Sequence, residues 1–267
     1  MRRFLIALTC AAVALAAPIG RGRAASVTPV LVELFTSEGC SSCPAADALV
    51  QSLVDAQPVE GAQVIALGQH VDYWDQLGWR DRFSSAAATN RQQRYSQVLN
   101  VDSVYTPEMV VDGREELVGS DASRARRAIG KAASVAHAQV TVAVEPGDGD
   151  RASATVTITD LPSVSRGDRA DVTVAVVESR LRSEIKGGEN RGRVLTHAPV
   201  VRQMTTIGEA TSPRLTTNIA FARDWQREQI TIVAFVQERF SRHVLGAAAT
   251  PLQSARRPGP VGPGAIR

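Results

Sequence analysis

The chain has 267 residues, of which 44% are hydrophobic and 21% are charged. These fractions match those of average globular proteins, so they exclude a disordered chain or a fibrous repeat over most of the length. The formal net charge is +3, but seven Arg residues in segments 1–24 and 251–267 supply the excess. Without them, 23 basic residues stand against 27 acidic ones, a net charge of about −4. The central segment is therefore mildly acidic, and its net charge gives no electrostatic support for a nucleic-acid partner.

Residues 1–24 are predicted to be an export signal. Two Arg residues precede an apolar run over residues 4–17, which is too short to span a bilayer. Cleavage after Ala16 and cleavage near Ala24 both fit the pattern of small residues. No later segment has the length and apolarity of a membrane span. We therefore expect a periplasmic or secreted protein with no membrane span in its mature chain.

Removal of this signal also removes Cys10 and leaves one C-x-x-C pair, Cys40 and Cys43, in an oxidising compartment. A disulfide that closes so small a loop gains little chain entropy, which argues against a purely stabilising role. Residues 30–35 are predicted to form a buried strand, and a helix is predicted to begin at Cys40. Backbone N–H groups and the helix dipole would then stabilise a Cys40 thiolate, and Cys43 would act as the resolving thiol.

The order of elements in the first half predicts a thioredoxin layout. The elements predicted next are a strand over 63–67, a helix over 84–99, a hairpin of strands 108–111 and 116–118 across Asp112-Gly113, and a helix from Asp121 or Ser123 to about 136. A right-handed crossover joins the first two strands. Thr106 and Pro107 precede the third strand, where such folds place a cis-proline that faces the cysteine pair. We therefore predict a cis Thr106–Pro107 bond.

Beyond residue 138 the pattern changes to short strands separated by Gly, Pro and Asp. Four strands are predicted over 140–144, 154–158, 171–176 and 230–236. Regular short strands favour a β-sandwich. We therefore expect an α/β thioredoxin-like domain over 27–137, with an insertion at about 70–100, followed by an all-β sandwich-like domain over 138–250. The Pro- and Gly-rich tail 251–267 is expected to be disordered.

Several polar residues are candidates for tuning the cysteine pair or contacting a partner. His70 and Asp72 lie two apart at the end of a predicted strand, and Glu38 just before Cys40 would disfavour its thiolate. A loop anchored by polar caps is the alternative interpretation of this region. The second half has a polar patch around Gly187-Gly188, which comprises Glu189, Asn190, Arg191, Arg193, His197 and Arg202. We consider it an anion-binding or partner-contacting site, or else a solvated loop with salt bridges.

These motifs together resemble the uncharacterised secreted bacterial proteins grouped as domain-of-unknown-function family 1223. The matching segments are 32–44, 70–75, 77–79, 105–113, 188–190, 192–193, 195, 197 and 200–202. The resemblance implies a thioredoxin-like fold in the first half and brings no settled activity. Compared with thioredoxin itself, no Trp precedes Cys40, and Ser41-Ser42 replaces Gly-Pro. These differences argue against general disulfide reductase activity.

Three functions from different classes fit the sequence. The favoured hypothesis is an exported thiol-disulfide oxidoreductase that needs no cofactor besides its own disulfide, and whose partners are protein thiols or disulfides of the cell envelope. Thr106 and Pro107 would help to hold the substrate chain. The second is a binding protein with a permanent structural disulfide. The third is a thiolate site for a soft metal such as Cu(I), completed by His70 or Met109, although no dedicated metal site is predicted.

Overall fold

The computed structural model describes residues 27–252, so the predicted export signal and nearly all of the predicted disordered tail lie outside the described residues. The helices in this range are α1 (Cys43–Ala56), α2 (Ala86–Val98), α3 (Ala122–Ala133) and one 3-10 helix, η1 (Arg227–Gln229). None of the helices that the structure describes has the length and apolarity of a bilayer-spanning segment.

Thirteen strands accompany these helices within residues 27–252. The strands of the first half are β1 (Thr28–Thr36), β2 (Ala62–His70), β3 (Glu108–Val111) and β4 (Glu115–Val118). The strands of the second half are β5 (Gln139–Pro146), β6 (Arg151–Thr159), β7 (Ala170–Glu178), β8 (Arg182–Glu184), β9 (Val194–Thr196), β10 (Val200–Glu209), β11 (Arg214–Ala220), β12 (Ile230–Glu238) and β13 (Val244–Pro251).

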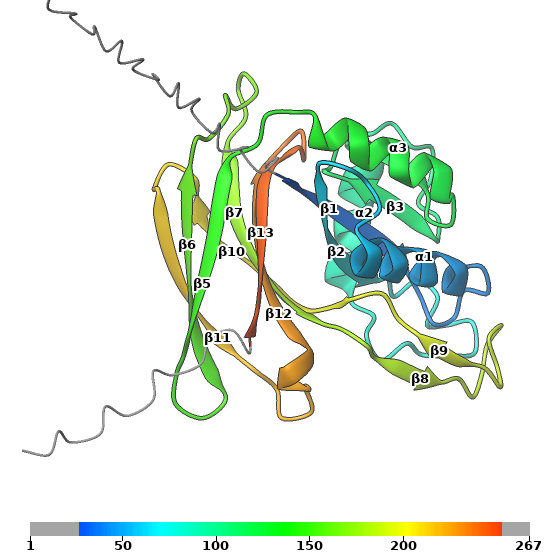
Figure 1. Cartoon of the computed structure of the whole chain (residues 1–267). Helices are drawn as coiled ribbons and strands as arrows, with labels where there is room; N and C mark the ends of the chain where they lie inside the picture. Colours follow the sequence, from blue (N-terminus) through cyan, green and yellow to red (C-terminus); the bar gives the residue numbers. More distant parts are fainter. Residues whose placement is uncertain (1–26, 253–267) are drawn as a thin grey trace, which may run out of the picture.

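One mixed sheet of eight strands runs through both halves of the chain, in the order β13-β12-β7-β10-β2-β1-β3-β4 (Figure 1). β1 and β2 are parallel, and β10 of the second half lies parallel to β2 with Val200 opposite Gly68. The Gly68 N–H donates to the Pro199 carbonyl at 2.6 Å. A Cβ atom at residue 68 would lie 2.8 Å from that oxygen, so this junction requires a glycine.

The predicted fold class, an α/β thioredoxin-like domain followed by an all-β sandwich-like domain, is therefore wrong. Strands of both halves are hydrogen-bonded in the same sheet, while β11, β6 and β5 form a separate three-stranded sheet and β8 and β9 a two-stranded one. The physical reason lies in β1 and β2, whose side chains are buried on both faces. Leu31, Ile65 and Leu67 pack against second-half residues such as Val177 and Phe235. The second half thus completes the core of the first.

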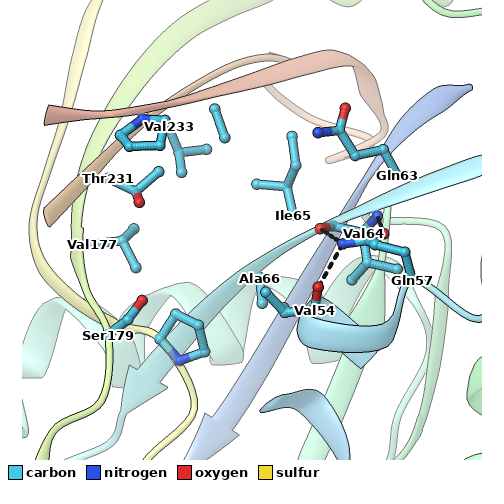
Figure 2. Close-up of a pocket in the computed structure, with 13 residues that line it drawn as sticks. Val54, Gln57, Gln63, Val64, Ile65, Ala66, Val177, Ser179, Thr231 and Val233 are labelled. Carbon is cyan, nitrogen blue, oxygen red and sulfur yellow. Dashed lines mark hydrogen bonds between the residues drawn. The ribbon is translucent and has the colours of Figure 1, made fainter. Parts of the chain in front are cut away.

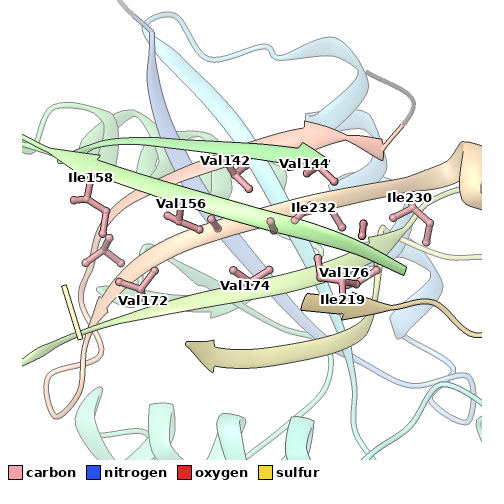
Figure 3. Close-up of a cluster of buried hydrophobic side chains, with 14 of the residues drawn as sticks. Val142, Val144, Val156, Ile158, Val172, Val174, Val176, Ile219, Ile230 and Ile232 are labelled. Atoms are coloured by element: carbon pink, nitrogen blue, oxygen red, sulfur yellow. The ribbon is translucent and has the colours of Figure 1, made fainter. Parts of the chain in front are cut away.

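A further core lies between the three-stranded sheet and the second-half strands of the large sheet. The burial of β6 alternates along the strand, so that one face of β6 is buried. Val142 and Val156 on this side belong to the same cluster as Val174 and Ile232 on the large sheet (Figure 3). The alternating pattern that predicted strands beyond residue 138 reflects this packing.

The local elements predicted for the first half are present. β1, β2, α2 and α3 overlap the predicted ranges, and the Asp121 carboxylate caps α3 by accepting from the Arg124 N–H. The β3–β4 hairpin turns at Asp112 and Gly113, which have φ angles of 46° and 64°. A Cβ at Gly113 would lie 1.9 Å from the Arg242 carbonyl oxygen, so the hairpin also needs glycine to pack against the β12–β13 connection.

A buried ionic network joins the two halves. Arg91 of α2 donates to both carboxylate oxygens of Glu33 on β1, at 2.5 and 2.7 Å, and to Gln237 of β12 at 3.1 Å. The Tyr95 hydroxyl donates to the same carboxylate. Burial alone raises the pKa of Glu33, but the charge and hydrogen bonds of Arg91 outweigh burial and hold the pKa below its usual value.

Replacing the arginine of this network should destabilise the protein strongly. Arg91→Met leaves the Glu33 carboxylate buried without its cation, and we expect a loss of about 3–5 kcal/mol in the free energy of unfolding. Denaturant titration followed by circular dichroism measures this loss. Arg94→Met, on an exposed position of the same helix, is the control and should change stability by less than about 0.5 kcal/mol. Equal effects of the two substitutions would contradict a structural role for the pair.

Candidate functional site

The Cys40–Cys43 disulfide lies in the turn between β1 and α1, with the two Cα atoms 5.4 Å apart. The predicted start of the helix was three residues too early, because α1 begins at Cys43 with Ser42 as its N-cap. Cys40 instead belongs to the preceding turn, in which its N–H donates to the Ser37 carbonyl and its carbonyl accepts from the Cys43 N–H. Both cysteines are buried, each with 1% of its surface exposed.

A loop of the second half contacts the backbone of this turn. β8 and β9 form a hairpin that extends from the main sheet and lies beside the N-terminal end of α1 (Figure 1). In the loop between them, the Asn190 side-chain amide donates to the carbonyls of Glu38 and Cys40, both at 2.9 Å. Glu189 accepts from the Ser41 N–H at 2.9 Å, and Arg193 donates to the Asn190 side chain at 2.7 Å. The structure thus brings three residues of the predicted polar patch to the cysteine turn.

Arg202, another residue of that patch, lies elsewhere. Its guanidinium is 3.2 Å from Glu178 and 3.5 Å from Asp224, and it stacks over Phe83 and Trp225. The ring of Phe83 in turn meets the rings of His70 and His197, with centroids 5.4 and 5.3 Å apart, so Arg202 adjoins these histidines through Phe83.

The Thr106–Pro107 peptide bond is cis, which confirms the prediction. The indole N–H of Trp74 donates to the Thr106 hydroxyl at 2.9 Å. The same tryptophan lies close to Gly39, the residue before Cys40, because a Cβ atom added to Gly39 would be 3.3 Å from the Trp74 Cβ. Thr106 and the residue before Cys40 therefore contact the same tryptophan. A methyl group at Gly119 would lie 3.1 Å from both Ala46 of α1 and Pro107, which places Pro107 near the first turns of this helix.

Behind the disulfide lies a buried polar cluster. His70 Nδ1 is 2.6 Å from an Asp81 oxygen, and His197 Nε2 is 3.0 Å from the Ser183 hydroxyl. His197 Nε2 also lies 3.4 Å from a Glu38 oxygen, which is an ion-pair distance without hydrogen-bond geometry. The two imidazole rings meet edge to face with centroids 5.3 Å apart. His70 and Glu38, both predicted candidates, therefore belong to one cluster.

Asp72 points away from that cluster. The Asp72 carboxylate accepts from the Thr89 hydroxyl at 2.6 Å, and the Asp72 backbone N–H donates to the Thr89 hydroxyl oxygen at 3.1 Å. These bonds tie the segment after β2 to the first turns of α2. The two-residue spacing that suggested a shared direction for Asp72 and His70 does not apply, because β2 ends at His70.

In this cluster the pKa values of two carboxyl groups are lowered, and the pKa of one histidine is raised. Burial favours the neutral form of carboxyl groups, yet the favourable interactions of His197, Ser183 and Trp79 with Glu38 hold its pKa below its usual value. Burial likewise opposes ionisation of Asp81, but the charge and hydrogen bond of His70 lower its pKa. For His70, burial is outweighed by the attraction of nearby carboxylates, so its pKa is raised.

Two residues of the cluster were missed by sequence reasoning. Asp47 on α1 accepts from the Thr36 hydroxyl at 2.8 Å and from the Ala198 N–H at 2.9 Å, and Asp81 lies in the loop after β2. Asp47 stands four residues after Cys43 within an apolar helical pattern, and a carboxylate on the buried face of a helix was the signal available. The residues around Asp81 form no comparable sequence pattern that would indicate its place in the cluster.

Two clefts differ in their relation to this site. One borders the cluster, and its lining is Glu38, Trp79, Arg80, Arg82, Arg182, Ser183, Glu184 and Lys186. The other lies where the end of α1 meets β2, β7 and β12, with walls that include Val54, Ile65 and Val233 (Figure 2). Its lining contains no charged residue and no residue of the cysteine turn. The first cleft therefore borders the polar cluster through Glu38 and Ser183, and neither cysteine is among its lining residues.

None of the curated proteins matches this chain. Among solved structures, a crystal structure of a protein from Agrobacterium tumefaciens is similar at a TM-score of 0.61 and 25% identity, covering 84% of this chain and 94% of that one. HBP35 of Porphyromonas gingivalis is similar at a TM-score of 0.59 and 15% identity, covering 91% of this chain and 80% of that one, which shows a shared fold alone.

The model of a protein family of unknown function, DUF1223, matches residues 31–237. The match includes the cysteine turn, the cis Thr106–Pro107 bond, and the loop that carries Glu189 and Asn190. It confirms the family expected from the sequence motifs. The chain belongs to the family of proteins of unknown function DUF1223.

Proposed function

We propose that this protein is an exported thiol-disulfide oxidoreductase in which Cys40 is the attacking thiol and Cys43 the resolving thiol. Its substrates would be protein disulfides or thiols in the cell envelope. No cofactor is needed beyond the Cys40–Cys43 pair itself, since the pair carries the two electrons that the exchange transfers.

The reaction follows from exchange between a thiolate and a disulfide. The Cys40 thiolate attacks one sulfur of a substrate disulfide and forms a mixed disulfide, while the other substrate sulfur leaves as a thiolate and takes up a proton. The Cys43 thiolate then attacks the Cys40 sulfur, which closes the Cys40–Cys43 disulfide and releases the second substrate thiol. The substrate gains two electrons and the protein loses two. The same steps in reverse oxidise a substrate dithiol.

The observation that carries this proposal is the set of contacts around the disulfide. A bridge between residues three apart restricts the unfolded chain little, so stabilisation alone does not account for it. Yet Asn190 and Glu189, about 150 residues away in sequence, hold the backbone of the turn, and Trp74 joins it to Thr106. Such convergence of separate segments on one reactive pair is typical of a functional site.

Burial of both sulfurs imposes a condition on this reaction. A substrate sulfur cannot reach Cys40 while both cysteines are buried, because an attacking thiolate requires access. Release of the Asn190 and Glu189 contacts would uncover the turn. We therefore include opening of the loop between β8 and β9 as a step before exchange. Burial also favours the second candidate, a permanent structural disulfide, and redox titration distinguishes the two.

The redox titration has a defined expected result. The isolated protein should contain no free thiol at Cys40 or Cys43 and should gain two alkylatable thiols on reduction, as measured by intact mass. Equilibrium against glutathione buffers should give a reduction potential between about −120 and −270 mV, the range of catalytic pairs. A potential below about −300 mV would identify a structural disulfide and remove the proposal.

The roles of the two thiols predict unequal trapping. Cys43→Ser leaves the attacking thiol without its partner, so mixed disulfides with envelope proteins should accumulate and appear on non-reducing gels. Cys40→Ser should trap few or none, and it serves as the matched control because each variant retains one thiol. Equal trapping by the two variants would contradict the assigned roles.

The contacts between the β8–β9 loop and the cysteine turn predict an effect on the rate at which the disulfide is reduced. Asn190→Ala removes two hydrogen bonds to the turn, each with a net stabilisation of about 0.5–1.5 kcal/mol, so the open population should rise about 5- to 150-fold. Reduction of the disulfide by dithiothreitol, followed by thiol labelling, should accelerate accordingly. Asn218→Ala, at an exposed position of β11, is the control and should leave the rate unchanged. An unaltered rate in Asn190→Ala would show that this amide does not control access.

A further inference from the structure

Three buried side chains beside the disulfide converge from separate elements. Asp47 comes from α1, His70 from the end of β2, and His197 from the residue after β9. Each offers one potential ligand atom, and these atoms lie within 4.8 Å of one another. The exposed fraction of each residue is 4% or less. Two imidazoles and a carboxylate are a donor set that zinc sites use.

One nitrogen of this cluster lacks any partner. His70 Nδ1 is engaged by Asp81 at 2.6 Å, whereas His70 Nε2 is buried and has no hydrogen-bond partner in the structure. Native proteins rarely leave a buried polar atom unpaired, so such an atom calls for a ligand or a role. Because Nδ1 is occupied, Nε2 is the nitrogen that remains for an ion.

Each of the three side chains is also oriented by a second partner. Asp81 holds His70, the Ser183 hydroxyl holds His197, and Asp47 accepts from the Thr36 hydroxyl and the Ala198 N–H. A carboxylate that accepts from the far nitrogen of a ligating histidine is the usual outer partner of a metal site. The Asp81–His70 pair has this arrangement.

The charges around the cluster favour a cation. Glu38, Asp47 and Asp81 bring three buried carboxyl groups together with two imidazoles. Among the ion pairs found within residues 27–252, none joins an Arg or Lys to any of the three. An anion would meet like charge here, whereas a divalent cation would compensate it.

We propose that Asp47, His70 and His197 form a binding site for one divalent transition-metal ion, of which Zn²⁺ is representative, while the Cys40–Cys43 disulfide is intact. A tetrahedral ion at 2.0–2.2 Å separates its ligands by roughly 3.3–3.5 Å, so closure on the ion requires shifts of at most about 1.5 Å. Three protein ligands leave the fourth position open to water. The site uses no thiolate and stands independently of the proposed exchange reaction.

Equilibrium dialysis of untagged, oxidised protein against Zn²⁺ tests the site. We expect one equivalent bound per chain, a rise in Tm on adding Zn²⁺, and visible absorption bands of tetrahedral Co²⁺ when Co²⁺ replaces Zn²⁺. His70→Gln and Asp47→Asn should each abolish stoichiometric binding. Asp81→Asn, which replaces the carboxylate that holds His70 and leaves the three ligands in place, should weaken it about 10- to 100-fold.

The control variant is His137→Gln, since His137 pairs with another buried aspartate, Asp112, at 2.8 Å outside the cluster. It should bind Zn²⁺ as the unaltered protein does, and circular dichroism checks that every variant is folded. Absence of binding by the oxidised protein would overturn the proposal, as would undiminished binding by folded His70→Gln. Binding that appears only after reduction and disappears in Cys43→Ser would place the metal on the thiolates and also overturn it.

Discussion

The pairing of β10 with β2 is the constraint on which the rest of the structure depends. The close approach of the Pro199 carbonyl to Gly68 leaves no room for a side chain at residue 68. This junction joins the strands of both halves into one sheet and fixes the direction from which the chain enters β10. The preceding residues, His197 and the loop with Asn190, are thereby brought to the cysteine turn. The candidate site is therefore composed of both halves, and neither half contains it alone.

Local signals were sufficient to predict most of the first half. Asp112-Gly113 specified a hairpin because both residues adopt positive φ, and Asp121 marked the start of α3 because a carboxylate there satisfies a free backbone N–H. Five strands of the second half, β8 to β11 and β13, were not predicted. β10 is interrupted by two register shifts and is partly exposed, so its sequence lacks a strict alternation. Which strands share a sheet depends on contacts distant in sequence, and periodicity carries no information about them.

The site shows the same difference between local sequence signals and contacts distant in sequence. The C-x-x-C pair, Glu38, His70, Glu189 and Asn190 were each recognisable from residue type and neighbours, but nothing in the sequence indicated that the last two lie against the cysteine turn. Asp72 was grouped with His70 from spacing along a strand, and the end of β2 at His70 separates them. Long-range placement of short polar motifs is therefore the part of this site that required the structure.

Two buried acidic networks in this protein are neutralised in different ways. Glu33 is paired with Arg91, whose guanidinium keeps its charge at every physiological pH, so that network suits a permanent structural link between β1, α2 and β12. Glu38 and Asp81 instead face His197 and His70, and imidazole nitrogens can bind protons or metals. A core that needed only stability would be served equally well by arginine at both places. The use of histidine beside the disulfide distinguishes this cluster from the Glu33–Arg91 network, and buried titratable groups with opposed pKa shifts are concentrated at functional sites.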